Sequence, residues 1–292
     1  MPQRAFSVDP AEYPFQSRWY QRGGSAMHYI DVGEGIPVVM CHGNPTWSYI
    51  YRNIIKALSP NFRCIAYDLP GFGFSEHPAG YGYTPQEHAE WVEALLFEHL
   101  RLEKFILVMQ DWGGPIGLSI ATRFPERILG LVISTTFAWA PRPISRIFST
   151  VFGSTLGRHL ILSHNFFAAR LVPLLLTRKA ATATTLKAYT DPFPTPASRR
   201  GTAVFPRQLV AATPWLEAIR ARLRTLAGKP VEFVFGLKDV GTRPADMARW
   251  FEYFPDAGVQ RVAAANHFTQ EDCPECYVTA VKRIAGKLEA TS

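Results

Sequence analysis

An acidic residue in a tight turn gives the strongest chemical signal in the sequence. Asp111 follows the apolar run 105–108 (Phe-Ile-Leu-Val) and precedes 112–115 (Trp-Gly-Gly-Pro), so a strand ends in a turn that leads into a helix. This pattern is typical of a nucleophile elbow, which exposes an attacking side chain at the carboxyl edge of a sheet. Helix N-caps are also often Asp, so the motif alone leaves a structural role open. At an elbow, Asp111 would be the attacking group.

Three further positions carry the groups that such a nucleophile needs. The segment 42–45 (His-Gly-Asn-Pro) follows a strand-like run, and the backbone N–H groups of Asn44 and Trp112 are the expected oxyanion hole. His267 follows the last strand-like run, where the base belongs in the chain order nucleophile, acid, histidine. Asp239 directly follows another such run and is the predicted acid that orients His267 and stabilises its charged form.

Short apolar runs alternate with helix-like segments along both ends of the chain. The strand-like runs are 38–41, 64–67, 105–108, 131–133, 231–235 and 259–263, and the helix-like segments of the first half are 48–58, 84–100 and 115–124. Uninterrupted apolar strands are typical of a parallel sheet covered by helices on both faces. The alternation therefore predicts an α/β fold with a mostly parallel, doubly wound sheet.

The alternation stops near residue 137 and resumes after 210. The segment 137–210 is rich in Phe, Leu, Ala and Arg at helical spacing, with a Pro-rich break at 191–196. We therefore predict a core formed by 1–136 and 211–292, with 137–210 as an inserted helical cap.

The excess positive charge lies in this predicted cap. The chain has 292 residues and a formal charge of +7. Segment 137–210 holds ten basic residues against one acidic residue, a net +9, which leaves 21 basic against 23 acidic residues, −2, for the rest. Charge confined to one segment argues against a nucleic-acid surface. Three roles stay open for this charge. It could attract a halide product, it could dock the chain on an acidic surface, or it could belong to the solvent-exposed face of amphipathic helices without a further function.

Other classes of protein are excluded by composition. The 47% hydrophobic content excludes a disordered chain. No apolar stretch approaches the roughly 18 residues of a membrane-spanning helix, and we expect no membrane association. The N-terminal segment MPQRAFSVDP lacks the apolar run of a secretory signal, which predicts a cytoplasmic location.

Four motifs together resemble the haloalkane dehalogenases of the α/β-hydrolase superfamily. They are His-Gly-Asn-Pro-Thr-Trp-Ser-Tyr (42–49), Asp-Leu-Pro-Gly-Phe-Gly-Phe-Ser (68–75), Gln-Asp-Trp-Gly-Gly-Pro (110–115) and His-Phe-Thr-Gln-Glu-Asp (267–272). One branch of that family places a Glu where this chain has Thr135. Asp239 combined with Asn44 and Trp112 is similar to the third subfamily, as are the cap segments 165–167, 170–173 and 199–201.

The resemblance implies hydrolytic dehalogenation of a small haloalkane to a primary alcohol, a halide ion and a proton. Asp111 would displace halide, and water activated by His267 would hydrolyse the alkyl ester. The Asn44 side-chain amide and the Trp112 indole would bind the halide. Phe205 and Pro206 of the cap would line the halide site, and the position of Trp139 near the cap junction predicts that it lines the tunnel. No cofactor and no metal ion is implied, and a homo-oligomer stays open.

One residue departs from the elbow pattern, and rival functions stay open. The residue two before the nucleophile is usually small, whereas here Met109 predicts a slightly distorted turn. An epoxide hydrolase would carry two cap tyrosines, but 137–210 contains only Tyr189. A fluoroacetate dehalogenase would carry Arg at the positions of Trp112 and Pro115. A hydrolase-fold ligand-binding protein without catalysis is the non-enzyme alternative.

The four cysteines predict no zinc site. Cys273 and Cys276 form a single C-x-x-C without a second pair or matching His ligands. Cys41 and Cys64 fall in strand-like runs and are expected to be buried. In a cytoplasmic protein we expect reduced thiols at all four positions.

Overall fold

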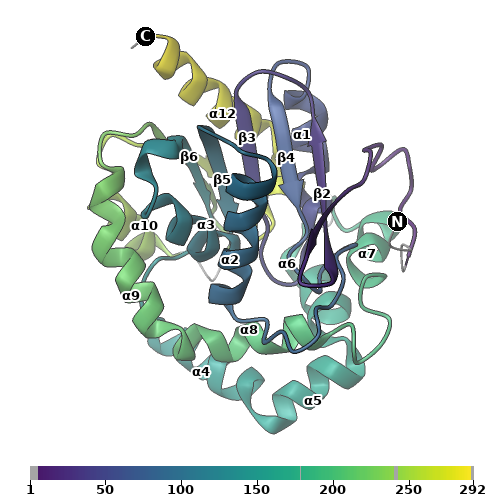
Figure 1. The fold of residues 1–292 in the computed structure, drawn as a ribbon. Helices are drawn as coiled ribbons and strands as arrows, with labels where there is room; N and C mark the ends of the chain where they lie inside the picture. Colours follow the sequence, from purple (N-terminus) through teal and green to yellow (C-terminus); the bar gives the residue numbers. More distant parts are fainter. Residues whose placement is uncertain (1–5, 178, 240–242, 291–292) are drawn as a thin grey trace.

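The computed structural model describes residues 6–177, 179–239 and 243–290 (Figure 1). Arg178, one of the ten basic residues of the predicted cap, and the first five residues of the N-terminal segment lie outside the described residues. In the described ranges, no helix combines the length and hydropathy required to cross a bilayer.

One eight-stranded sheet forms the centre of the molecule, in the order β1-β2-β4-β3-β5-β6-β7-β8. The pairs β1–β2 and β2–β4 are antiparallel, and the pairs from β4–β3 to β7–β8 are parallel. The strands are β1 (Arg18–Arg22), β2 (Ser25–Val32), β3 (Pro37–Cys41), β4 (Arg63–Tyr67), β5 (Phe105–Gln110), β6 (Ile128–Ser134), β7 (Val231–Gly236) and β8 (Gly258–Val262). The predicted mostly parallel sheet is confirmed.

Helices cover both faces of this sheet, so the doubly wound prediction is also confirmed. The helices outside the segment between β6 and α9 are η1 (Ser48–Tyr51), α1 (Arg52–Leu58), α2 (Pro85–Ala94), η2 (Leu95–His99), α3 (Gly113–Ala121), η3 (Pro125–Arg127), α9 (Thr213–Arg222), η5 (Leu223–Leu226), α10 (Pro244–Phe251), α11 (Thr269–Asp272) and α12 (Pro274–Glu289). Buried residues of α1 and α12 share one hydrophobic core, and those of α2, α3, α9 and α10 share another.

Alternate side chains along the central strands belong to these two cores in turn. Val38 and Met40 of β3 belong to the core under α1 and α12, whereas Val39 and Cys41 belong to the opposite core. Successive residues of a strand point to opposite faces, so a strand buried on both faces must be apolar throughout. This explains why the central strands read as uninterrupted apolar runs in the sequence.

The chain between β6 and α9 is helical and leaves the sheet. It contains α4 (Pro143–Gly153), α5 (Thr155–His164), η4 (Phe167–Leu171), α6 (Val172–Leu175), α7 (Ala183–Thr190) and α8 (Arg200–Ala211). Figure 1 shows α4, α5 and α8 together below the sheet, at the end of the molecule away from the C-terminus. Aromatic contacts join α4 to η4, since Phe148 and Phe152 of α4 pack against Phe167 of η4.

Candidate active site

Asp111 occupies a sharp turn between β5 and α3. Its φ of 50° lies in the left-handed region, which residues other than glycine seldom adopt. Two hydrogen bonds from the end of β6 fix the turn. The Asp111 N–H donates to the Thr135 carbonyl at 3.2 Å, and Thr136 Oγ1 donates to the Asp111 carbonyl at 2.6 Å. The carboxylate is thereby presented at the carboxyl edge of the sheet, where it lines a cavity.

Two glycines make room for this turn. A Cβ at Gly114 would lie 1.8 Å from Thr136 Oγ1, and a Cβ at Gly43 would lie 2.2 Å from Asp111 Oδ1. Both distances are well inside van der Waals contact. Without a side chain at Gly114 the start of α3 can approach the segment after β6, and without one at Gly43 the loop after β3 can approach Asp111.

Met109 is accommodated by a third glycine. The fully buried Met109 points at α3, where a Cβ on Gly117 would lie only 2.9 Å from its Sδ. Strand β5 stays in register at Met109, which pairs with Cys41 and Ile133. The pairing of β5 is therefore regular at Met109, and the bulk of its side chain takes the space that Gly117 leaves free.

The loop after β3 places a backbone donor on Asp111. The Asn44 N–H donates to Asp111 Oδ1 at 2.7 Å. His42 holds this loop: its Nδ1 lies 2.9 Å from the Gly43 carbonyl, and its Nε2 accepts from the Leu69 N–H at 2.9 Å. Because Nε2 accepts, the proton sits on Nδ1. Burial lowers the pKa of His42, so this imidazole is neutral, and its role is to fix the loop through these two hydrogen bonds.

His267 lies between two carboxylates. Its Nε2 is 3.4 Å from Asp111 Oδ2, and its Nδ1 is 3.3 Å from Asp239 Oδ2. Burial of the imidazole opposes its charged form, but Asp239 and Asp111 outweigh burial and raise the pKa of His267 to about 10. The structure therefore brings together Asn44, Asp111, Asp239 and His267, which the sequence places far apart.

Two polar residues to which the sequence assigned no role in this chain also contact the histidine. Gln110 Nε2 lies 2.9 Å from His267 Nε2, and Thr135 Oγ1 donates to the His267 carbonyl at 3.0 Å. Gln110 lies inside the recognised elbow motif, but whether its side chain turns toward the histidine depends on packing. Thr135 stands where one branch of the family has an acid, and here it fixes the backbone of the histidine loop instead.

A cavity of about 300 Å³ opens above these groups. Asn44, Asp111, Trp112, Asp239 and His267 all line it. The remaining wall is mostly apolar. Its apolar residues from the segment after β6 and from α4, η4, α6 and α8 are Phe137, Trp139, Ala140, Pro141, Ile144, Phe148, Phe167, Leu171, Val172, Leu175, Pro206 and Leu209. Such a cavity fits a small apolar ligand whose reacting atom reaches the carboxylate.

Two of the three residues expected to line the pocket do so, and Phe205 does not. Trp139 and Pro206 line the cavity. Phe205 is fully buried and lies outside the lining. Its ring packs on Trp112, with the two centroids 5.1 Å apart, so it touches the cavity only through that indole. Phe137 contacts the Trp112 ring at 5.1 Å and lines the cavity itself.

One ion pair interrupts the apolar wall. Arg142 Nη1 lies 3.0 Å from Asp246 Oδ2, and both residues line the cavity. The same carboxylate oxygen accepts the backbone N–H of Arg243 at 3.0 Å, at the start of α10. The pair thus connects the segment leading to α4 with α10.

Within the described ranges, no three His, Cys, Asp or Glu side chains are grouped as ligands for a metal ion. The side chains gathered at this site are two carboxylates, one imidazole, one amide and one indole, beside the backbone N–H of Asn44.

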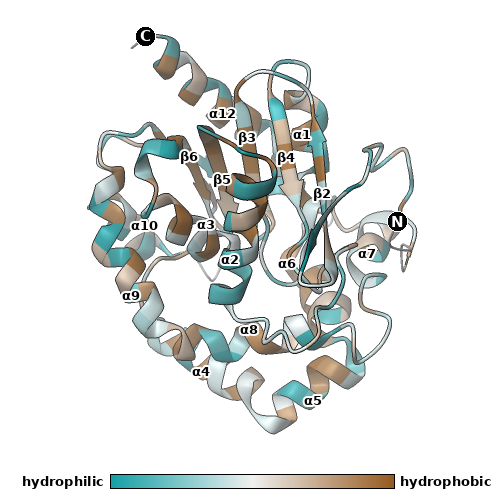
Figure 2. Cartoon of the chain, viewed as in Figure 1, coloured by the Kyte–Doolittle hydropathy of each residue, from teal (hydrophilic) through white to brown (hydrophobic). Residues whose placement is uncertain are grey.

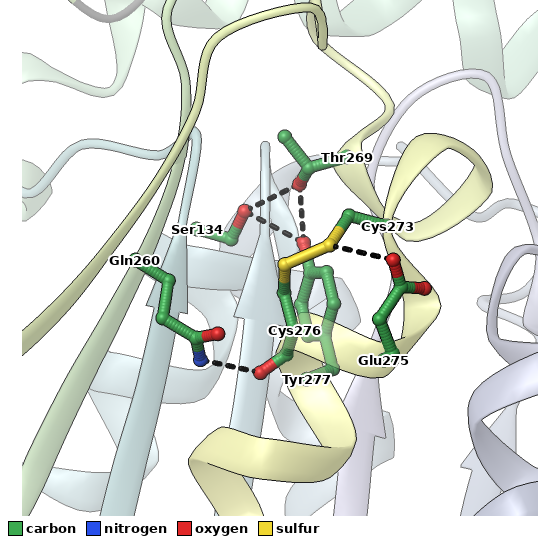
Figure 3. The surroundings of a disulfide bond; sticks show 7 residues. All are labelled: Ser134, Gln260, Thr269, Cys273, Glu275, Cys276 and Tyr277. Carbon is green, nitrogen blue, oxygen red and sulfur yellow. Dashed lines mark hydrogen bonds between the residues drawn. A yellow bond between two sulfur atoms is a disulfide. The ribbon is translucent and has the colours of Figure 1, made fainter.

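The expectation of reduced thiols is wrong for one cysteine pair. Cys273 and Cys276 form a disulfide, with their Cα atoms 5.4 Å apart (Figure 3). Pro274 begins α12 between them, and the first turn of a helix brings residues three apart onto one side. The expectation of buried, free thiols at Cys41 and Cys64 is confirmed.

The disulfide lies beside a buried hydroxyl cluster at the base of the histidine loop. Ser134, Thr269 and Tyr277 are joined by hydrogen bonds between their hydroxyl oxygens, 2.8 Å for Ser134–Thr269 and 2.6 Å for Tyr277–Ser134. Figure 3 shows this cluster next to the two sulfur atoms. Both features fasten the start of α12 below the loop that carries His267.

Comparison with known proteins places the chain in a family. Residues 36–274 match the family described as alpha/beta hydrolase fold. Haloalkane dehalogenase 2 of Mycobacterium tuberculosis is 39% identical over 279 residues, covering 94% of this chain and 97% of that protein. The cis-3-alkyl-4-alkyloxetan-2-one decarboxylase of Shewanella oneidensis is 33% identical, covering 94% of this chain and 90% of that protein.

Solved structures give the same result. The crystal structure of haloalkane dehalogenase DbeA from Bradyrhizobium elkani superposes with a TM-score of 0.86 at 30% identity, covering 95% of this chain and all of that one. Fold, elbow, histidine loop and sequence identity agree, and the chain belongs to the haloalkane dehalogenases of the α/β-hydrolase family.

Proposed function

We propose that this chain hydrolyses haloalkanes to a primary alcohol, a halide ion and a proton. The observation that carries this proposal is the position of Asp111. Its Oδ1 accepts from the Asn44 N–H at 2.7 Å, and its Oδ2 faces His267 at 3.4 Å, at the floor of a mostly apolar cavity. Membership of the dehalogenase family supports the same reaction.

In the first step Asp111 is the nucleophile. Because Oδ1 is held by the Asn44 N–H, Oδ2 is the oxygen with a lone pair free for the halogen-bearing carbon. The new C–O bond forms as the carbon–halogen bond breaks, which leaves an alkyl ester on Asp111 and a halide ion. The Asn44 side-chain amide and the Trp112 indole N–H receive the halide, and neutral donors let it leave again more readily than a Lys or Arg would.

In the second step His267 is the base. Formation of the ester removes the negative charge of Asp111, one of the two carboxylates that raise the pKa of His267. The pKa therefore falls, the imidazolium releases its proton to solvent, and the neutral imidazole takes a proton from the attacking water. The oxygen of this water bonds to Cγ of Asp111, the oxyanion is stabilised by the N–H groups of Asn44 and Trp112, and Asp239 stabilises the imidazolium. Collapse of this intermediate breaks the bond between Cγ and the alkoxy oxygen, and the alcohol leaves with the proton of the added hydroxyl, which restores the Asp111 carboxylate.

The helical segment 137–210 acts as a cap over this site in the proposal, with 1–136 and 211–292 as the core. Trp139 and Pro206 shape the substrate pocket, and Phe205 supports the Trp112 ring from behind. The reaction requires a haloalkane and water, without cofactor or metal ion. We place the reaction in the cytoplasm.

An epoxide hydrolase is disfavoured by the position of its candidate acid. Tyr189 is fully buried, donates to Glu271 Oε1 at 2.5 Å and lies outside the cavity lining. Its hydroxyl is therefore engaged elsewhere and is not aimed at a bound epoxide. A fluoroacetate dehalogenase would carry arginines where Trp112 and Pro115 lie, and both of these side chains are buried.

Halide release from 1-bromobutane and 1,2-dibromoethane tests the proposal. Wild-type protein should release halide continuously, and Asp111→Asn should release none. His267→Phe should release a single equivalent and then stop, because the ester on Asp111 is no longer hydrolysed. Mass spectrometry should locate the added alkyl group on the peptide that contains Asp111.

A broad panel separates this reaction from its rivals. It includes an epoxide and a cis-3,4-dialkyl oxetan-2-one, on which the Shewanella relative is named to act. Absence of halide release from every haloalkane, or turnover of only the oxetanone with loss of CO2, would overturn the proposed reaction.

A further inference from the structure

Helix α4 exposes a row of large apolar side chains. Ile144, Ile147 and Val151 are 53%, 59% and 52% exposed, and Leu156 at the start of α5 is 70% exposed. The spacing of the first three, at i, i+3 and i+7, places them on one face of the helix. We call these four residues the cap stripe. Adjacent exposed apolar side chains of this size usually mark a site of interaction.

Basic residues border the cap stripe. Arg146 on α4 and Arg158 on α5 are exposed, and neither helix contains an acidic residue. The single acidic residue of 137–210, Asp191, pairs with Lys187 on α7. Figure 2 shows apolar segments in brown and polar segments in teal along the ribbons of α4 and α5. Such a surface is complementary to an anionic lipid bilayer: its apolar side chains match the acyl chains, and its positive charges match the negatively charged headgroups.

The cap stripe also reaches the active-site cavity. Ile144 is exposed and lines the cavity at the same time, together with Ser145 and Phe148 of the same helix. Ile144 therefore belongs both to the outer face of α4 and to the cavity wall. A ligand dissolved in an apolar phase in contact with α4 would reach the cavity past this residue.

We propose that the cap stripe docks on the surface of an anionic lipid bilayer. Ile144, Ile147, Val151 and Leu156 would enter the boundary between headgroups and acyl chains, while Arg146 and Arg158 lie at the level of the lipid phosphates. The sequence analysis predicted no membrane association because no segment can span a bilayer. Peripheral docking needs only an exposed apolar face with basic neighbours, and exposure is visible only in the folded chain.

A second copy of the chain fits this surface less well. A symmetric contact between two caps would bring two segments of net charge +9 together, and like charges at an interface oppose association. Anionic lipid headgroups neutralise the same charge.

Docking has a consequence for substrate supply, which rests on the proposed function. Haloalkanes are apolar and concentrate in a bilayer, so a cavity that opens at the lipid surface near Ile144 draws on a higher local concentration than one that opens to water. The docking itself is independent of the reaction and is measured without substrate.

Vesicle flotation with the full chain tests docking. Wild-type protein should float with phosphatidylglycerol-containing vesicles at low salt, should bind pure phosphatidylcholine weakly, and should be released at high salt. Ile147→Ser/Val151→Ser should lower the partition coefficient by about tenfold, since two anchoring side chains are lost. Arg146→Gln/Arg158→Gln should lower it on anionic vesicles alone.

Matched substitutions outside the cap control for charge and hydropathy. Lys104 and Lys282 are exposed, and Leu237 is an exposed apolar residue after β7. Lys104→Gln/Lys282→Gln and Leu237→Ser should leave vesicle binding unchanged, and thermal unfolding of every variant checks that it is folded. Failure of the wild-type chain to bind anionic vesicles, or equal binding by the stripe variant, would overturn docking.

Two further measurements separate the remaining outcomes. If sedimentation velocity shows a dimer that Ile147→Ser/Val151→Ser dissociates, and vesicles do not bind, the stripe is an interface between two copies and the proposal is wrong. With 1-bromohexane, anionic vesicles should raise halide release by wild type but not by the stripe variant. Lack of any halide release would contradict the proposed reaction, while flotation would still decide docking.

Discussion

Thr177, between α6 and α7, donates a 2.5 Å hydrogen bond to Asp272 Oδ1, five residues after His267. The other oxygen of Asp272 accepts the N–H of Asn266 at 3.4 Å, directly before the histidine. A parallel link runs through the neighbouring acid: Tyr189 donates to Glu271 Oε1, which also accepts from Arg52 Nη1 at 2.6 Å. Two adjacent carboxylates thus connect the helices after β6 to the histidine loop.

These links predict that Thr177→Val and Tyr189→Phe slow the hydrolysis of the alkyl ester. Each change removes one hydroxyl that fixes the loop, and a small misplacement of a base lowers its rate, here by about tenfold. Displacement of halide by Asp111 does not use His267 as a base and should continue. Rapid-quench measurements should therefore show a full halide burst followed by a reduced steady-state rate.

Thr190→Val is the control for this prediction. Its hydroxyl donates only within α7, to the Leu186 and Lys187 carbonyls, so the burst and the steady-state rate should stay at wild-type values. Equal reduction of burst and steady state in Thr177→Val would show that the contact acts on the pocket and not on the histidine.

The pKa of His267 should fall when either neighbouring carboxylate is neutralised. Asp239 and Asp111 raise this pKa to about 10, so Asp111→Asn, which resembles the neutral ester, and Asp239→Asn should each lower it. NMR titration of the imidazole measures the shift directly. An unchanged pKa in Asp111→Asn would contradict the proposed activation of the base, and Asp239→Asn should also lower kcat by about a thousandfold or more.

The same pKa sets the sign of a stability change with pH. The histidine binds its proton more tightly in the folded chain than at its ordinary pKa of 6.5. Its contribution to the free energy of unfolding is therefore complete below pH 6.5 and is lost as the pH rises toward about 10. Thermal unfolding of wild type should show this decline, and Asp239→Asn should show less of it.

Much of the fold and the site could be predicted from the sequence because strand ends carry the chemistry. Asn44, Asp111 and Asp239 each follow a buried strand, and the carboxyl ends of parallel strands meet at one edge of the sheet. The contacts of Gln110, Thr177 and Tyr189 could not be predicted in the same way. They depend on how side chains turn and on how the helices after β6 pack, and no local pattern encodes either.

The antiparallel strands β1 and β2 were missed although a signal was present. Gly23 and Gly24 lie between them with φ values of 57° and 77°, and a Gly-Gly pair between short strands is typical of a hairpin. Strand β1 lies at the edge of the sheet, so it carries polar residues such as Arg18 and Gln21. It therefore lacks the uninterrupted apolar run by which the buried strands were predicted.

The fit between Met109 and Gly117 predicts that substitutions at the two positions are coupled. Gly117→Ala alone should destabilise the chain, because its Cβ would approach Met109 Sδ to 2.9 Å. In a Met109→Ala background only the approach to Leu107 Cδ2 at 3.2 Å remains, and the helix preference of Ala offsets part of its cost, so the same change should cost much less stability. Chemical denaturation of the four proteins gives the coupling, expected at about 1 kcal/mol or more. Additive effects would show that the elbow tolerates Met109 for another reason.

The ring contact between Phe205 and Trp112 predicts that Phe205→Leu weakens halide binding. Phe205 does not line the cavity, but without its ring the indole loses the surface against which it packs. Bromide quenching of Trp112 fluorescence should give a dissociation constant raised about three- to tenfold, as for loss of about 1 kcal/mol of support. Phe193→Leu is the matched control, since Phe193 is equally buried and its ring contacts Phe72 at 6.0 Å. Phe193→Leu should lower the free energy of unfolding by a similar amount and leave the dissociation constant for bromide unchanged. An equal loss of bromide affinity in both variants would show that the affinity depends on the overall packing of the helices and not on the contact between Phe205 and the indole.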